Sequence, residues 1–253
     1  GLILSEVGWR VTLLDGGYKK YRYEVMQLIP KLSQQIKLVV ISGKTGSGKT
    51  NILREIASIG GNILDLEALA VHRGSLLGAV PNRSQPSQKY FESKLLDILE
   101  EFEAGSTVFV EAESSKIGDL HIPKGFWSEM CKAPCIQIKV PSEVRAEFLE
   151  SHYSDLKGDP ARLKALFQLA KKRVALGIVE EWRYFLEKKL WMPLALSLVT
   201  NYYDPAYNSH QSRQERKKIK TFSCSTLTNP SIKGLAHNIL EAGEDFTHSL
   251  KSK

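Results

Sequence analysis

Cysteine is scarce in this sequence, and its pattern indicates no disulfide framework. The 253 residues include three cysteines, Cys131, Cys135 and Cys224, an odd number. The first two stand at CxxxC spacing, but no second Cys or His pair lies at zinc-finger distance, so a zinc finger is not indicated either. We therefore expect reduced thiols in an intracellular, cytoplasmic protein. The chain begins at Gly1 and not at Met, which leaves an upstream targeting segment open.

Long apolar runs, repeats and low-complexity blocks are also absent. The most apolar stretch late in the chain, residues 190–199, falls short of the roughly 18 residues that span a membrane. Pro193 interrupts it, so we expect it in a core and expect no membrane partner. With 42% hydrophobic and 25% charged residues, the composition excludes disordered, collagen-like and coiled-coil chains. The sequence leaves the oligomeric state open.

The sequence does carry a surplus of positive charge. Lys and Arg total 35 against 28 Asp and Glu, which gives a net charge of +7. A surplus of this size favours polyanionic partners such as RNA, DNA or anionic lipid, but it is also common in proteins that bind none of them. Charge alone therefore leaves the partner undecided.

Strand and helix patterns alternate through the first half of the chain. Short β-branched or apolar runs that predict buried strands occur at 38–41, 62–66, 107–110 and 135–140. Helical spacing separates them at 51–59 and 88–102, and it dominates from 142 to 203. Strand, helix, strand in this order predicts an α/β fold with a parallel sheet, followed by a helical C-terminal section.

A phosphate-binding loop directly follows the first predicted strand. The run Gly-Lys-Thr-Gly-Ser-Gly-Lys-Thr at 43–50 fits G-x-x-x-x-G-K-[ST] at every fixed position and opens into a predicted helix. Glycines let backbone N–H groups curl around phosphate oxygens, the lysine neutralises the outer phosphates, and the last hydroxyl reaches Mg²⁺. The predicted phosphate-binding residues are Gly43, Gly46, Ser47, Gly48, Lys49 and Thr50.

Two glutamates after the third predicted strand suit the metal that such a loop uses. Glu111 and Glu113 follow the strand at 107–110, where a neighbouring strand of a P-loop protein carries its acidic residue. With Thr50 they form a predicted Mg²⁺ site. The alternative is a carboxylate that merely caps the strand.

A polar cluster follows the second predicted strand, in a region that holds the acceptor in P-loop kinases. Its candidate substrate-binding residues are Asp65, Glu67, His72, Arg73, Gly74 and Ser75. Arg73 suits a bidentate contact to phosphate. For His72, a general base and an ordinary surface histidine both stay open.

Basic residues late in the chain are candidates for a lid or for RNA contacts. They are Lys172, Arg173, Arg183, Arg216 and Lys217. A lid would stabilise phosphate charge, and a solvated helix face is the alternative. The tyrosines at 202, 203 and 207 either stack on bases or seal a helix end.

Taken together, several of these motifs resemble one family, the bacterial-type tRNA 2-selenouridine synthases. The likeness covers nearly all of residues 1–207. His-Arg-Gly-Ser at 72–75 and Glu-Ala-Glu-Ser-Ser-Lys-Ile-Gly at 111–118 are far more specific than the P-loop. The other matching stretches are LLDGGYK at 13–19, the loop at 43–50, DLEALA at 65–70, Gly78, QPSQ at 85–88 with Phe91-Glu92, and YYDP at 202–205.

The resemblance implies a transferase that acts on tRNA. Members join an N-terminal rhodanese domain to a P-loop domain, and they replace the sulfur of wobble 2-thiouridine with selenium from selenophosphate. A geranylated thiouridine made with geranyl diphosphate is the intermediate. The P-loop is implied to bind a diphosphate or a nucleotide, with ATP or GTP as the alternative ligands, while the rhodanese cysteine serves the exchange.

The resemblance also divides the chain. Residues 1–22 are expected to be a rhodanese remnant, 23–36 a connector, 37–207 the P-loop domain with its helical section, and 208–253 a basic tail. The rhodanese cysteine is expected upstream of Gly1, so no catalytic residue is assigned here and we expect a truncated product. A small-molecule kinase or NTPase and a non-catalytic RNA-binding module remain rival functions.

Overall fold

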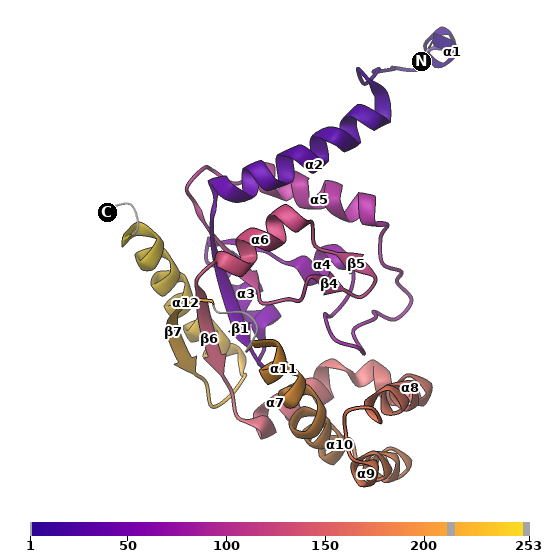
Figure 1. The fold of residues 1–253 in the computed structure, drawn as a ribbon, viewed down its shortest axis with the longest axis vertical. Helices are drawn as coiled ribbons and strands as arrows, with labels where there is room; N and C mark the ends of the chain where they lie inside the picture. Colours follow the sequence, from indigo (N-terminus) through magenta and orange to yellow (C-terminus); the bar gives the residue numbers. More distant parts are fainter. Residues whose placement is uncertain (1, 212–215, 250–253) are drawn as a thin grey trace.

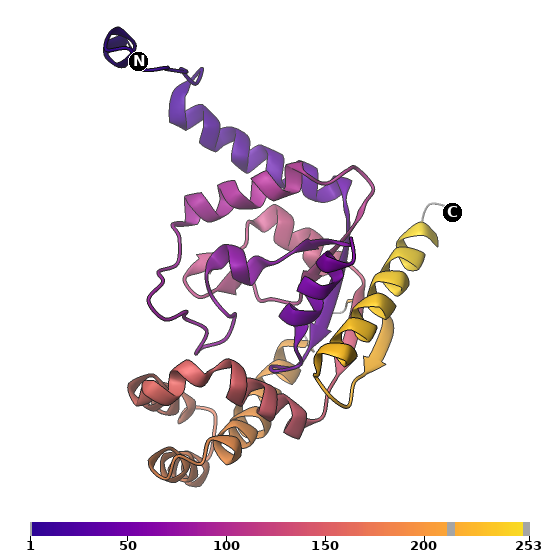
Figure 2. The same cartoon turned by 180° about the vertical axis from the view of Figure 1, so that it is seen from behind.

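The computed structural model describes residues 2–211 and 216–249, which form a three-layer α/β domain and a bundle of helices (Figure 1, Figure 2). Five parallel strands make the central sheet in the order β2-β3-β1-β6-β7. Their bounds are β1 Lys37–Gly43, β2 Asn62–Leu64, β3 Thr107–Glu111, β6 Cys135–Lys139 and β7 Lys218–Ser223. The predicted α/β class with a parallel sheet is confirmed.

Apolar side chains bury the central strands on both faces. β1 is buried from Leu38 onward, which is why its sequence is a continuous apolar run. One face is covered by α3 (Lys49–Ser58) and α12 (Asn229–Ser249), which pack against each other. The other is covered by α2 (Gly17–Gln35), α5 (Gln88–Glu100) and α6 (Lys124–Lys132). We call residues 17–139 and 216–249 the sheet domain.

Short elements complete the carboxyl edge of the sheet. Helix α4 (Leu66–Ala70) follows β2, and a small antiparallel hairpin pairs β4 (Lys116–Ile117) with β5 (Leu120–His121). Helix α1 (Leu2–Glu6) precedes the sheet domain.

The remaining helices form a unit with a core of its own, which we call the helical module (residues 142–211). It lies beyond the carboxyl ends of the strands (Figure 1). Fully buried Trp182 packs against Phe167 and Tyr202, and Leu77 of the sheet domain joins this core. Its elements are α7 Ser142–His152, a 3₁₀ turn Ser154–Gly158, α8 Pro160–Ala170, α9 Leu176–Glu187, α10 Trp191–Leu198, a π-helical turn Val199–Tyr203 and α11 Asp204–Gln211.

The structure corrects two expectations about the carboxyl-terminal part. The helical section lies between β6 and β7 in the chain, not at its end, and the described part of the predicted basic tail at 208–253 supplies β7 and α12 to the sheet domain. The sequence pattern does not reveal β7, because it is an edge strand with Lys218 and Lys220 exposed and their charge masks its alternation. Residues 212–215 and 250–253 of that tail lie outside the described residues.

At the amino-terminal end, α2 runs without interruption through the predicted boundary between residues 22 and 23. The assignment of residues 1–22 to a rhodanese remnant stays a prediction. Within the described part of the chain, no helix combines the length and apolarity that crossing a membrane requires.

Candidate phosphate and metal site

The predicted phosphate loop joins the central strand to a helix, as its sequence requires. Gly46 and Gly48 have φ values of 82° and 72°, in the left-handed region that favours glycine. Gly48 is the N-cap of α3 and supplies no side-chain cap, so the first N–H groups of the helix are available to an anion. The Lys49 Nζ donates to the Gly43 carbonyl, 3.0 Å away, at the start of the loop.

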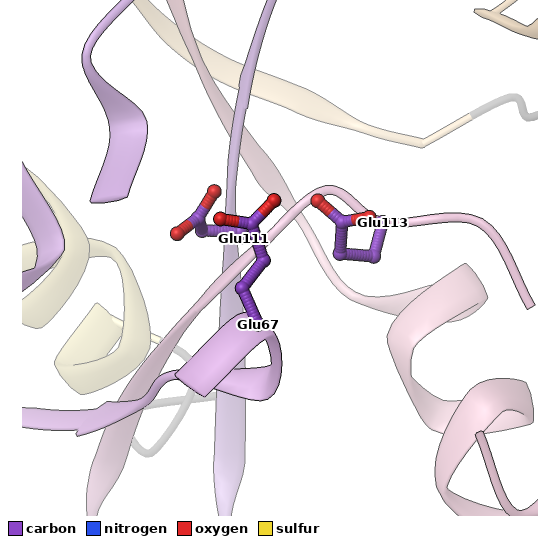
Figure 3. Close-up of side chains that lie close together, drawn as sticks. All are labelled: Glu67, Glu111 and Glu113. Carbon is purple, nitrogen blue, oxygen red and sulfur yellow. The ribbon is translucent and has the colours of Figure 1, made fainter. Parts of the chain in front are cut away.

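Three glutamates meet beside this loop (Figure 3). Glu111 ends β3, Glu113 follows two residues later, and Glu67 comes from the first turn of α4. One side-chain oxygen of each glutamate lies within 4.8 Å of the other two, and Thr50 Oγ1 donates to Glu67 Oε2 at 3.1 Å. The sequence predicts Glu111 and Glu113 as metal ligands and Glu67 as a substrate contact, and the fold brings all three together.

Burial and mutual repulsion disfavour the ionised form of these carboxyl groups. Burial, with a smaller contribution from a neighbouring carboxylate, raises the pKa of each to about 8: Glu113 acts on Glu67, Glu67 on Glu111, and Glu111 on Glu113. The Lys49 ammonium opposes all three shifts. Buried Glu111 Oε1 has no hydrogen-bond partner among the described residues.

The oxygen-only donor set of this cluster fits a hard cation. Carboxylate and hydroxyl oxygens are the ligands that Mg²⁺ takes in proteins, and the unpartnered Glu111 oxygen leaves an acceptor free for it. The residues that would hold the ion are Thr50, Glu67, Glu111 and Glu113.

The loop after α4 lies directly against the glutamates. Gly74 has a φ of 66°, which favours glycine, and a Cβ there would displace the carboxylate oxygens Glu67 Oε1 and Glu113 Oε2. His72 Nδ1 accepts the Gly74 N–H at 3.1 Å, and burial lowers the pKa of His72. His72 therefore braces the turn as a neutral ring.

The helical module holds the other side of this loop. Arg73 Nη1 donates to Asp155 Oδ1 at 2.9 Å, and its guanidinium lies over the Tyr153 ring, 4.7 Å from the centroid. The Ser75 and Tyr153 hydroxyls are 3.2 Å apart. Burial raises the pKa of Tyr153, so its hydroxyl stays protonated. Arg73 and Ser75 thus lie at the contact between module and loop.

A cleft of about 1800 Å³ opens over the phosphate loop, and most predicted site residues line it. Two of the predicted basic contacts, Arg173 and Arg216, line the cleft together with Lys218, which the sequence analysis did not assign. The lining residues do not include Asp65, Lys172, Arg183 or Lys217.

Local contacts explain two of the residues outside the cleft. Asp65 Oδ1 accepts the Ala68 N–H at 2.8 Å as the N-cap of α4, and Arg54 pairs with its other oxygen. The Lys217 ammonium lies over the ring of Phe246 on α12.

Comparison with known proteins identifies the family. The family model for the tRNA 2-selenouridine synthase AAA domain matches residues 36–173, which is more than half of the chain. This chain belongs to the tRNA 2-selenouridine synthase family. The matched segment of the family includes the phosphate loop, the three glutamates and the His-Arg-Gly-Ser turn.

Relatives named tRNA 2-selenouridine synthase extend the match. The proteins of Aeromonas salmonicida (strain A449) and Sulfurovum sp. (strain NBC37-1) are each 36% identical to this chain, over 154 and 152 residues, or 60% and 59% of it. That of Shewanella sediminis (strain HAW-EB3) is 30% identical over 247 residues, or 85% of it. The chain spans 40%, 40% and 65% of the length of these three synthases, respectively.

Three charged residues that the sequence analysis did not assign meet at the phosphate loop. They are Lys44, in the loop itself, Arg145, in the first turn of α7, and Asp204, in the first turn of α11. Asp204 stands in the Tyr-Tyr-Asp-Pro stretch of the family resemblance, and this position could have marked it as a site residue. Lys44 stands in the loop at 43–50, another stretch of that resemblance, whereas Arg145 had no such signal, because its partner is distant in sequence.

Proposed function

We propose that this chain is the phosphate- and tRNA-binding part of an enzyme that replaces the sulfur of wobble 2-thiouridine in tRNA with selenium from selenophosphate, through a geranylated intermediate. The observation that carries the proposal is one cleft in which a phosphate loop and three clustered glutamates lie within the segment that matches the synthase family. A tRNA substrate implies an intracellular protein, which the free cysteines support.

The phosphate loop would bind the diphosphate of geranyl diphosphate. In geranylation the sulfur of 2-thiouridine forms a bond to the first geranyl carbon, the carbon–oxygen bond to the diphosphate breaks and releases pyrophosphate, and the base gives up its N3 proton. Lys49, whose ammonium donates to the Gly43 carbonyl, would move its ammonium to the leaving group. Mg²⁺ held by Thr50 and the glutamates would neutralise further negative charge there.

An apolar cavity next to the phosphate loop supports a prenyl donor. It measures about 80 Å³ and shares Thr45, Ser75, Leu149, Tyr153 and Tyr203 with the lining of the cleft. An apolar cavity of about 150 Å³ admits benzene, so this one suits the end of a hydrocarbon chain. Its apolar walls are Leu77, Leu149, Leu156, Leu163, Trp191, Leu194, Ala195 and Leu198.

A small-molecule kinase or NTPase is the second candidate. The glutamate cluster beside Thr50 favours it, because P-loop enzymes that transfer phosphoryl groups hold Mg²⁺ with a loop hydroxyl and a nearby carboxylate. In both candidates the turn at 72–75 would position the acceptor.

The basic wall of the cleft supports a polyanionic partner. Arg173, Arg216 and Lys218 line it from both the helical module and the sheet domain. Lysines and arginines that face a groove attract the phosphate backbone of a nucleic acid. We therefore place the incoming tRNA strand along this wall.

A calorimetric titration with geranyl diphosphate and with Mg-ATP separates the two candidates. We expect geranyl diphosphate to bind more tightly than Mg-ATP, and we expect Lys49→Ala to weaken it about a hundredfold, because a charge-assisted contact to phosphate is lost. Lys94→Ala removes an exposed lysine on α5 that lies outside the cleft, and it should leave the titration unchanged.

Two results would count against the proposal. Tight Mg-ATP binding with weak geranyl diphosphate binding would move the kinase reading to first place. Tight tRNA binding that Lys49→Ala does not alter, with neither small molecule bound, would favour a non-catalytic RNA-binding module.

A further inference from the structure

The carboxylate of Asp204 lies between two cations at the junction of the helical module and the phosphate loop. Its two oxygens accept from Arg145 Nη1 and Nη2 at 2.8 and 2.9 Å, a bidentate pair. Oδ2 also accepts from Lys44 Nζ at 2.8 Å. The exposed fractions of the side chains are 3% for Arg145, 14% for Asp204 and 40% for Lys44, so the Asp204–Arg145 pair is nearly desolvated.

Arg145 carries this contact into the loop backbone. Its Nη1 also donates to the Thr45 carbonyl, and its Nε donates to the Val140 carbonyl after β6, both at 3.1 Å. Because a trans peptide holds C=O and N–H on opposite sides, a Thr45 carbonyl turned toward Arg145 turns the Gly46 N–H away from it. One guanidinium thus ties α11, the end of β6 and the middle of the phosphate loop together.

Close packing at the same point leaves the loop little freedom. A Cβ at Gly46 would lie 2.8 Å from the Arg145 carbonyl oxygen and 2.9 Å from Leu149 Cγ. The first two turns of α7 therefore lie directly on the loop. The π-helical turn Val199–Tyr203 immediately precedes Asp204, and such turns recur where a helix redirects a functional side chain.

From these contacts we propose that Asp204 is a positioning residue for the phosphate loop. It holds Arg145 and Lys44 so that the loop backbone is fixed before a phosphate arrives. The inference rests on the proposed function only in taking this loop as the phosphate site. N–H groups that are already in place bind an anion without the entropic cost of ordering the backbone. Asp204 would strengthen anion binding by removing that cost.

The sign of the effect separates positioning from simple electrostatics. Asp204 is a negative charge near an anion site, so if it acted only through its charge, Asp204→Asn would tighten the binding of inorganic pyrophosphate. If it positions the loop, the same change weakens binding. We expect a loss of about tenfold by calorimetry, because a charge-assisted, nearly buried contact is removed, and we expect Asp204→Glu to restore most of it.

Hydrogen exchange in the ligand-free protein gives a second readout. We expect the amides of residues 43–50 to exchange about tenfold faster in Asp204→Asn than in the wild type, because the loop opens more often. The matched control is Glu92→Gln, which removes another nearly buried partner of an arginine, Arg22, between α5 and α2 and away from the cleft. It should lower stability and leave both loop exchange and pyrophosphate binding unchanged.

Unchanged exchange at 43–50 or tighter pyrophosphate binding in Asp204→Asn would overturn the inference. A different pattern would overturn the proposed function: pyrophosphate binding that Lys49→Ala leaves intact. Because exchange is measured without ligand, it still decides the role of Asp204 in that case.

Discussion

The sheet domain and the helical module form the two walls of the cleft, and they differ in where along the sequence their site residues lie. The sheet domain supplies the groups that we propose contact phosphate or metal, and each lies within a few residues of a strand end: the loop after β1, Glu67 after β2, and Glu111 and Glu113 at β3. The helical module instead supplies Arg145, Tyr153, Asp155 and Asp204, which hold the loops in place. The groups proposed to bind phosphate and metal are therefore locally encoded, whereas the groups that position them come from distant segments.

A substitution at the contact between the walls should have the largest effect. Gly46→Ala combines a positive φ, costing about 1 kcal/mol, with a clash against backbone and side chain of α7. We expect the free energy of unfolding to fall by about 3 kcal/mol in urea titrations, with loss of pyrophosphate binding.

Gly60→Ala is its matched control. Gly60 also has a positive φ, 92°, but a Cβ there meets nothing within 4 Å. This variant should lose about 1 kcal/mol and bind pyrophosphate normally. Equal losses in the two variants would show that the module does not press on the loop, and the comparison of the two walls would fail.

A change among the glutamates of the sheet domain should have an intermediate effect on the free energy of unfolding, and that effect should depend on pH. Each glutamate has a pKa near 8 in the folded protein against an ordinary value of 4.5, so between these values the folded state holds more protons than the unfolded state. The free energy of unfolding should therefore fall as pH rises from about 5 to 8. We expect Glu111→Gln to flatten this slope and to add on the order of 2 kcal/mol at pH 8.

In the wild type alone, Mg²⁺ should reverse the fall in the free energy of unfolding that accompanies rising pH. Metal binding needs ionised carboxylates, so stabilisation by MgCl₂ should grow between pH 6 and 9 and be weak in Glu111→Gln. Urea titrations across this range with and without MgCl₂ measure both effects. A wild-type slope that rises with pH would contradict the raised pKa values.

The smallest effect is expected on the basic wall. Lys218→Glu should weaken tRNA binding several-fold and lower the slope of log affinity against log salt by about one or more, because a phosphate contact is lost. Lys172→Glu, at an exposed position that does not line the cleft, should change neither. Filter-binding titrations over a range of salt test this, and equal effects of the two changes would mean that tRNA does not follow the cleft.

The sequence predicts those parts of the fold that depend on short patterns. The strands at β1, β2, β3 and β6 and the phosphate loop appear where their apolar runs and glycines indicate. Strand β7 escaped because an edge strand needs no continuous apolar run, and its lysines resemble a solvated tail.

The limits for the site have the same physical origin. Asp65 and Glu67 look alike in sequence, but the first turn of α4 uses Asp65 as its N-cap and turns Glu67 toward Thr50. Arg145 and Asp204 are 59 positions apart, and only the packing of α7 against the end of α10 and its π-helical turn brings them together. No local pattern encodes such a pair.

The late position of β7 in the chain has a consequence for the order of folding. β7 pairs in parallel with β6, yet the whole helical module separates Cys135 from its partner Lys218, a gap of about 80 residues whose closure has an entropic cost. During synthesis the phosphate loop emerges long before β7 and α12, which cover the edge of β6 and the apolar face beside α3. A nascent chain therefore passes through a stage in which the edge of β6 is unpaired, and chaperones that bind exposed strands would matter most at that stage.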